Sequence, residues 1–195
     1  MLKLRLALVG VLLCACSPAD PGPMGDQGEQ GPEGMRGMTG MMGDPGPSGT
    51  AGQDVIEVYG TGQLTVSTGT TAFTTIPGLS TVVDVPEDTK VVISTNGGVQ
   101  CTGVGTSFSA VDIAIFVDGV ASNQGGQRRV IAANTTAVGQ IIANWSMMRT
   151  YPLTPGNHTI EVRAINAEPT ATAANVSSAS APQLQAVLTV MLIRQ

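Results

Sequence analysis

The second part of the chain, from about residue 55, consists of short apolar runs in which hydrophobic and polar positions alternate. In segments 111–117 and 160–164, aliphatic side chains occupy every second position, and Asp112, Ala114, Phe116, Glu161 and Arg163 lie between them. Alternation with a period of two predicts half-buried β-strands. No segment carries apolar residues at helical spacing over three turns. The pattern therefore predicts an all-β domain.

Ten segments of this kind are separated by turn residues. We expect strands at 55–59, 63–67, 72–76, 81–85, 90–95, 111–117, 128–133, 137–149, 158–165 and 183–193. The expected turns are Pro77-Gly78, Pro86-Glu87-Asp88, Asn96-Gly97-Gly98, Asp118-Gly119 and Pro155-Gly156-Asn157. The Ala-, Thr- and Ser-rich stretch 169–182 is expected to be a long loop. Short strands at this spacing predict a β-sandwich.

The last expected strand is apolar on both of its faces. One face carries Leu184, Ala186, Leu188, Val190 and Leu192, and the other carries Val187, Met191 and Ile193. One layer of a sandwich buries only one face of a strand, so a strand of this kind lies either between two layers or against another subunit. Which of the two faces is the inter-subunit face stays open.

Before this domain the chain has glycine at every third position. The repeat comprises Gly22, Gly25, Gly28, Gly31, Gly34, Gly37, Gly40, Gly43, Gly46, Gly49 and Gly52. Three polyproline-II-like strands can share one axis only where every third residue lacks a Cβ, so this period predicts a collagen-like triple helix over 22–54. The alternative is a disordered Gly- and Pro-rich linker, which needs no period. The repeat has five carboxylates and only Arg36 as a cation, so we expect a neighbouring domain to hold three chains together.

The chain begins with a short basic segment, an apolar run over 6–13 and then small residues. This is the pattern of a secretory signal, too short to span a bilayer. The sequence Leu13-Cys14-Ala15-Cys16 resembles the lipoprotein box of bacteria, which implies acylation of Cys16 after cleavage. Ser17 then implies an outer-membrane or cell-surface location. The alternative is an ordinary cleaved signal with a coincidental Cys.

The expected organisation is a signal peptide at 1–15, a lipidated linker at 16–21, a collagen-like stalk at 22–54 and a β-sandwich head at 55–195. This order of modules resembles bacterial collagen-like proteins with trimeric jelly-roll heads of the complement and tumour-necrosis-factor type. The resemblance rests on module order, head length and the apolar last strand. It implies a homotrimer. The head departs from that family in its low aromatic content, 3% over the whole chain.

Composition leaves little material for catalysis. Charged residues make up 12% of the chain, the formal net charge is −5 and there is one histidine, His158. A net negative charge argues against nucleic-acid binding. A single histidine supplies neither a triad nor a metal cluster, so we expect no enzyme activity, cofactor or metal. The acidic turn with Asp84, Glu87 and Asp88 is the one candidate for calcium, with a solvated turn as the alternative.

Two further features have more than one interpretation. Arg128 and Arg129 could contact an anion, but neighbouring residues of a strand point to opposite faces, so they should not form one patch. Cys101 is the only thiol after Cys16. It is therefore either a buried small residue or a reactive or interchain thiol.

The expected function is that of a structural or adhesive lipoprotein, a surface-anchored homotrimer held by the bilayer through Cys16. Its head would bind an extracellular protein or a glycan. Two alternatives stay open: a ligand-free spacer or phage-fibre-like coat component, and a carbohydrate-binding head.

Overall fold

A computed structural model of the chain describes residues 22–31 and 52–195. The chain divides into two units, residues 1–46 and 47–195. Residues 22–31 are exposed and contain neither helix nor strand. The expected lipidation site Cys16 and the repeat glycines from Gly34 to Gly49 lie outside the described residues.

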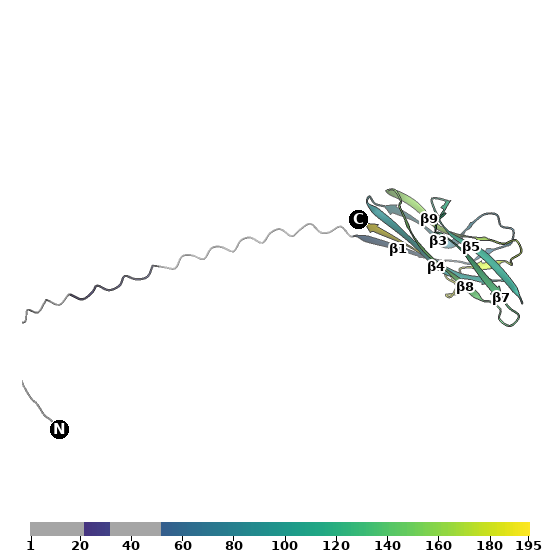
Figure 1. Cartoon of the computed structure of the whole chain (residues 1–195), viewed down its shortest axis with the longest axis horizontal. Coiled ribbons are helices and arrows are strands. Elements are labelled where there is room, and N and C mark those ends of the chain that lie inside the picture. The colour runs from purple at the N-terminus through teal and green to yellow at the C-terminus, as the bar shows by residue number, and fades with distance from the viewer. Residues whose placement is uncertain (1–21, 32–51) are drawn as a thin grey trace, which may run out of the picture. The chain divides into compact units, whose positions relative to one another are not determined.

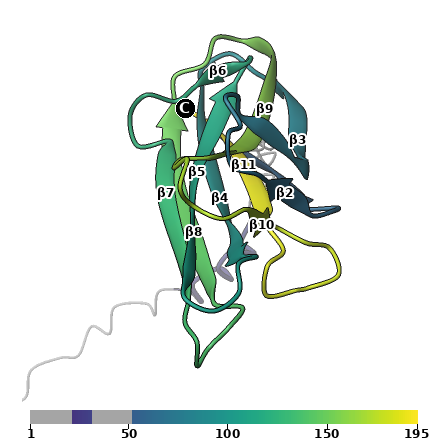
Figure 2. The ribbon, with the colours of Figure 1, turned by 90° about the vertical axis from the view of Figure 1, so that its right-hand side faces the viewer.

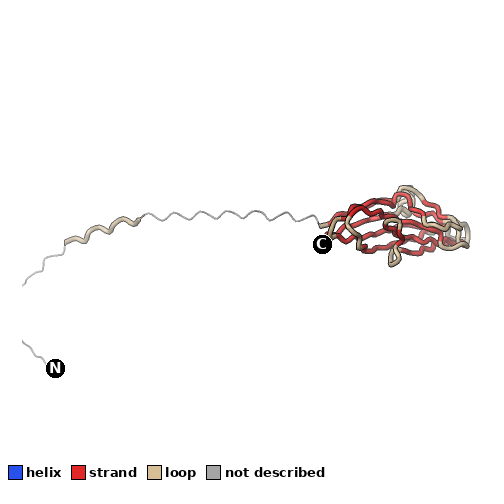
Figure 3. Tube along the Cα trace, turned by 90° about the horizontal axis from the view of Figure 1, so that it is seen from above, coloured by secondary structure: helices blue, strands red, loops and turns tan. Residues whose placement is uncertain are grey.

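Residues 52–195 form an all-β domain (Figures 1 and 3). The strands are β1 (Gln53–Tyr59), β2 (Leu64–Val66), β3 (Thr74–Val85), β4 (Thr89–Cys101), β5 (Ser107–Val117), β6 (Val120–Ala121), β7 (Gln127–Asn134), β8 (Ile142–Tyr151), β9 (Gly156–Asn166), β10 (Ala174–Val176) and β11 (Val187–Arg194). The described part of the chain has no helix, and so none long and apolar enough to cross a membrane.

The first sheet, called sheet A here, is centred on β4. One edge of β4 pairs with β8 over residues 91–100. The other edge pairs with β11 over residues 89–96 and with the short β10 over residues 99–101. Beyond these, β1 pairs with β11 and β2 pairs with β10. All these pairings are antiparallel. Because β1 pairs only with β11, β1 is an edge strand, and β11 lies inside the sheet between β1 and β4.

The second sheet, sheet B, is centred on β5. Its order is β3-β9-β5, and the other edge of β5 pairs with β7 and β6. All these pairings are antiparallel too, and the prediction of an all-β domain with two antiparallel sheets is confirmed. In Figure 2, β5 and β7 lie beside β4 and β8, and a long segment joins β9 to β11.

The core lies between the two sheets. The largest side chains that are fully buried are Ile76, Leu79, Ile93, Ile113, Ile115, Ile160 and Leu188, which come from strands of both layers. Removing each such side chain from water stabilises the fold by roughly 1.5–3 kcal/mol. The alternating positions predicted over 111–117 and 160–164 therefore supply the core, as the period of two requires.

Two expected turns are wrong. Pro77-Gly78 lies inside the single strand β3, where it forms a bulge that shifts the register against β9 between Thr75 and Ser80. The strand tolerates proline because β3 is an edge strand, and Gly78 takes a φ of 86° that favours glycine. Likewise, Asn96-Gly97-Gly98 continues β4 to Cys101, paired throughout with β8.

Other boundaries also differ. The expected strand 137–149 begins at Ile142, and β11 begins at Val187 because residues 183–186 are in no strand. The short β10 lies in the expected loop 169–182, held between β2 and β4. At the other end, β1 begins at Gln53, so the last triplet of the glycine repeat already contributes to the head.

Candidate interface and binding sites

The outer face of sheet A, the face turned away from the core, carries two groups of apolar side chains, which the polar row Glu57, Thr189 and Ser94 separates. Residues directly opposite each other in paired strands point to the same face. The register places Val55 opposite Met191 and Met191 opposite Val92, and Tyr59 lies opposite Val187. These positions alternate with the fully buried Leu188 and Val190, so they face outward.

The apolar side chains of this face are only partly covered by the chain itself. Val55 is 61% exposed, Tyr59 50% and Met148 68%. Val92, Val187, Met191 and Ile193 are half-buried. In the register of residues 53–59, 90–96, 146–150 and 187–193, Glu57 and Lys90 are the charged residues on this face. The outward face of the last strand therefore carries apolar side chains on either side of Thr189, and residues 52–195 leave them partly uncovered.

The outer face of sheet B carries ion pairs beside exposed apolar side chains, Val82 at 62% and Ile131 at 59%. Arg129 is bound by Asp112, with Nε to Oδ1 at 2.9 Å, and also by Glu168. Arg163 pairs with Glu161, and its guanidinium lies 4.4 Å from the centre of the Phe116 ring. The long arginine side chains of this face cover small residues on the strands, such as Ala114, which is fully buried.

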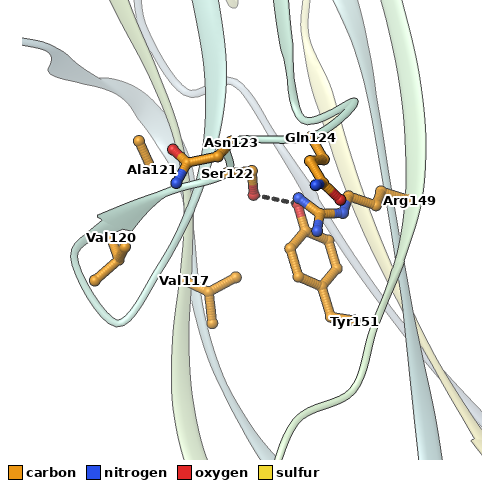
Figure 4. Close-up of a pocket in the computed structure, with 8 residues that line it drawn as sticks. All are labelled: Val117, Val120, Ala121, Ser122, Asn123, Gln124, Arg149 and Tyr151. Carbon is orange, nitrogen blue, oxygen red and sulfur yellow. Dashed lines mark hydrogen bonds between the residues drawn. The ribbon is translucent and has the colours of Figure 1, made fainter.

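A cavity of about 370 Å³ is lined by residues of β5, β6, β8 and the loop that follows β6. It is lined by Val117, Val120, Ala121, Ser122, Asn123, Gln124, Arg149 and Tyr151. Figure 4 shows the guanidinium of Arg149 next to Tyr151 and Gln124, with Asn123 on the far side of Ser122. The hydroxyls of Ser122 and Tyr151 are 2.5 Å apart and hydrogen-bonded.

His158 lies at the start of β9 and is held on both sides. Its Nδ1 is 2.7 Å from the Asp118 carboxylate, and its Nε2 is 2.8 Å from the backbone oxygen of Thr154. The hydrogen bond to Asp118 raises the pKa of His158, and the same bond lowers the pKa of Asp118. Both ring nitrogens face acceptors, so the protonated ring satisfies both. This geometry suits a structural ion pair.

Cys101 is a free cysteine that is 2% exposed. Its sulfur is 3.1 Å from the Thr172 hydroxyl, and Ser107 is also in contact. Burial raises the pKa of this thiol, but hydrogen bonds from Ser109, Thr172 and Ser107 offset that effect and leave the pKa below its usual value. The position favours the buried small residue over the accessible thiol.

The remaining sequence candidates are not brought together. Asp84, Glu87 and Asp88 form no group with metal-ligand geometry, and the described residues contain no such cluster of three. Arg129 points to the outer face of sheet B with Asp112, whereas Arg128 lies opposite the buried Ile113. The two arginines therefore do not form one patch, as the period of two predicts.

The repeat glycines fall into two groups. Gly22, Gly25, Gly28, Gly31 and Gly52 lie in described residues, and a Cβ added at any of them would meet nothing within 4 Å. The others lie outside the described residues. The single chain therefore gives no steric reason for glycine at the five described positions.

Sequence reasoning missed Arg149 and Tyr151 as site residues. The one available signal was the position of Arg149, two residues before Tyr151. The alternate positions before it in the same strand, Trp145 and Met147, are apolar. That signal says nothing of the β6–β7 loop that completes the cavity. In comparisons with known proteins, no family model matches this chain and its sequence matches no curated protein.

Proposed function

We propose that this chain is a surface-anchored, non-enzymatic lipoprotein in which three copies join through a collagen-like stalk and display three β-sandwich heads. The observation that carries the proposal is the glycine at every third position from Gly22 to Gly52. A triple helix requires this period because only glycine fits at its crowded axis.

The strand pairings of the head support a jelly roll. The eight longer strands pair as nested antiparallel partners: β1 with β11, β3 with β9, β4 with β8, and β5 with β7. This is the order that results when one long hairpin is rolled into two facing sheets. The resemblance to trimeric jelly-roll heads therefore extends from module order to topology.

The outer face of sheet A is the surface that we propose to bury between copies. Val55, Val92 and Met191 lie in one cross-strand row, with Val187 beside Tyr59 in another. Apolar area buried in an interface stabilises it by about 25 cal/mol per Å². A second copy of the chain is the fitting occupant because the repeat brings copies together at Gly52, beside β1. The stalk, with its like charges, then relies on the head for register.

The anchor completes the proposal. Cleavage of the leader after Ala15, within Leu13-Cys14-Ala15-Cys16, leaves an acylated Cys16 as the new N-terminus. Two or three acyl chains hold a protein stably on a membrane, since each buried methylene adds roughly 0.8 kcal/mol. The location that fits is the outer membrane or the cell surface of a bacterium.

Sedimentation of the head alone tests the proposal. A chain that starts at Gly52 keeps all of β1, and we expect it to be folded by circular dichroism and to sediment as a trimer. A well-folded head that remains a monomer at high concentration would contradict the trimeric proposal. The better interpretation would then be a monomeric sandwich on a flexible tether.

A further inference from the structure

Arg149 is a cation on the inward face of β8, and no carboxylate of residues 52–195 pairs with it. It lies opposite Ile93 in the register of β8 and β4, and Ile93 is fully buried in the core. Its position therefore belongs to the inward face of sheet A, where the other large residues are apolar. Arg149 is half-buried and lines the cavity, with its guanidinium next to Tyr151 (Figure 4).

The neighbours of Arg149 hold it but do not neutralise it. Its guanidinium carbon lies 4.8 Å from the centre of the Tyr151 ring, a cation–π distance. Within residues 52–195, no carboxylate oxygen lies within 4 Å of its nitrogens, whereas Arg129, Arg163 and Arg194 each have an acidic partner. The N–H donors of this guanidinium are therefore open to a bound anion.

The rest of the cavity is uncharged, and two hydrogen bonds hold Ser122 in it. Ser122 donates its backbone N–H to the Ile115 oxygen at 3.0 Å, and its hydroxyl bonds Tyr151. Two amide side chains, Asn123 and Gln124, follow directly in the loop, and Val117 forms part of an apolar wall. The cavity therefore combines the N–H donors of one guanidinium, two side-chain amides and a small apolar surface.

From this set we propose that the cavity binds an acidic sugar through its carboxylate. The planar guanidinium can hold a carboxylate by two parallel hydrogen bonds, and amides both donate to and accept from hydroxyls. The lining contains one cation and no second one, which matches a singly charged carboxylate better than a doubly charged phosphate. This inference builds on the proposed function because it gives the displayed head a ligand class.

The test uses the full chain, purified with its lipid in detergent, and ligand-observed saturation-transfer NMR. The probes are D-glucuronate, D-glucose and D-glucose 6-phosphate, each titrated separately. We expect glucuronate to bind at least about tenfold more tightly than glucose, since a charge-assisted hydrogen bond adds an effect of that size. It should also bind more tightly than glucose 6-phosphate, whose second charge meets no second cation in the lining. Arg149→Ala should lose about tenfold to a hundredfold of the glucuronate affinity, and Arg149→Lys should lose part of it.

Arg128→Ala is the matched control, because it removes the same charge from an exposed position that does not line the cavity. It should leave glucuronate binding unchanged. Three results would overturn the inference: no glucuronate binding, equal binding of glucose or the phosphate, or equal losses in Arg149→Ala and Arg128→Ala. Sedimentation of the same sample separates the two proposals. A trimer that does not bind the sugar would refute only the proposed ligand, and a monomer that binds the sugar would refute only the proposed trimer.

Discussion

Gly97 and Trp145 are direct cross-strand partners, and the indole ring fills the space that a side chain at Gly97 would need. A Cβ on Gly97 would lie 2.3 Å from Trp145 Cη2 and 2.6 Å from the Cβ of Ala186. Trp145 is buried and its Nε1 is 3.4 Å from the Thr95 hydroxyl. A glycine that looks like a turn residue is therefore a packing position.

We expect Gly97→Ala to destabilise the head by about 1–3 kcal/mol, because neither the indole ring nor Ala186 can move aside without disturbing the core. Denaturant unfolding measures the change. Gly139→Ala is the control, since a Cβ there meets nothing within 4 Å and the φ of Gly139 is not positive. Equal stability losses in both variants would contradict the packing role of Gly97.

The two faces of β11 should respond differently to a charge. Val187→Glu places a carboxylate on the outer face of sheet A and should yield a folded monomer or a weakened trimer. Leu188→Glu places it in the core, where Leu188 is fully buried, and should unfold the head. Sedimentation and circular dichroism distinguish the two results.

Val82→Glu is the control for the interface, because Val82 is 62% exposed on the outer face of sheet B. It should remain a trimer. If it dissociates as readily as Val187→Glu, the interface does not lie on sheet A.

The titration of His158 should show the ion pair with Asp118. It is the only histidine, so its ring signals in NMR are unambiguous, and we expect a midpoint above the ordinary 6.5. Asp118→Asn should lower the midpoint while it keeps an oxygen for the Thr159 N–H. A midpoint at or below 6.5 in the unmodified chain would contradict the pair.

The same pair gives stability a pH window. Because the folded-state pKa of His158 is raised, its contribution is complete below about pH 6.5 and is lost as the pH rises through that pKa. The pKa of Asp118 is lowered, so its contribution is present above about pH 3.8 and is lost as the pH falls. The midpoint temperature of unfolding should therefore fall both at high pH and at low pH. In Asp118→Asn both decreases should be smaller.

Gly37→Asp should abolish the triple-helix signal in circular dichroism and leave the head folded, because a Cβ at the shared axis of three chains has no room. Thr39→Asp is the matched control, since it adds the same charge to the same triplet at a position other than glycine. An unchanged signal in Gly37→Asp, or no such signal in the unmodified chain at low temperature, would favour the disordered linker.

Cys16→Ser should abolish labelling of the chain by a palmitate analogue. Cys14→Ser is the control and should still be labelled, because the cleavage that exposes Cys16 does not depend on Cys14. Label retained on Cys16→Ser would remove the lipid anchor from the proposal.

The periodicity of the sequence predicts the class of fold, and strands such as β5 and β9 follow directly from their alternating residues. It does not predict where a strand continues through glycine, because the compensating group is distant in sequence. Trp145, which packs on Gly97, lies 48 positions later in the sequence. At the bulge, a Cβ on Gly78 would lie 2.3 Å from the backbone oxygen of Tyr59. The three residues of β10 form a strand only because β2 and β4 provide edges on both sides.

The candidate sites divide in the same way. The two apolar faces of the last strand can be predicted from the sequence, but choosing between them requires the register against β4, which buries Leu188 and turns Val187 outward. Arg149 gives almost no sequence signal, because its importance comes from the loop that carries Ser122 and from the absence of a carboxylate nearby in residues 52–195.

The pairing of β1 with β11 has a mechanical consequence for a head under tension. Arg194 donates its backbone N–H to the Gly52 oxygen at 3.0 Å, and the seven residues of β1 are all paired with β11. Hydrogen bonds of an antiparallel pair lie perpendicular to the strands. A pull that enters at Gly52 along β1 therefore loads all of these bonds together in shear, rather than one after another as in unzipping. The first strand can thus act as the force-bearing element of the head, and the last strand, inside sheet A, as its clamp.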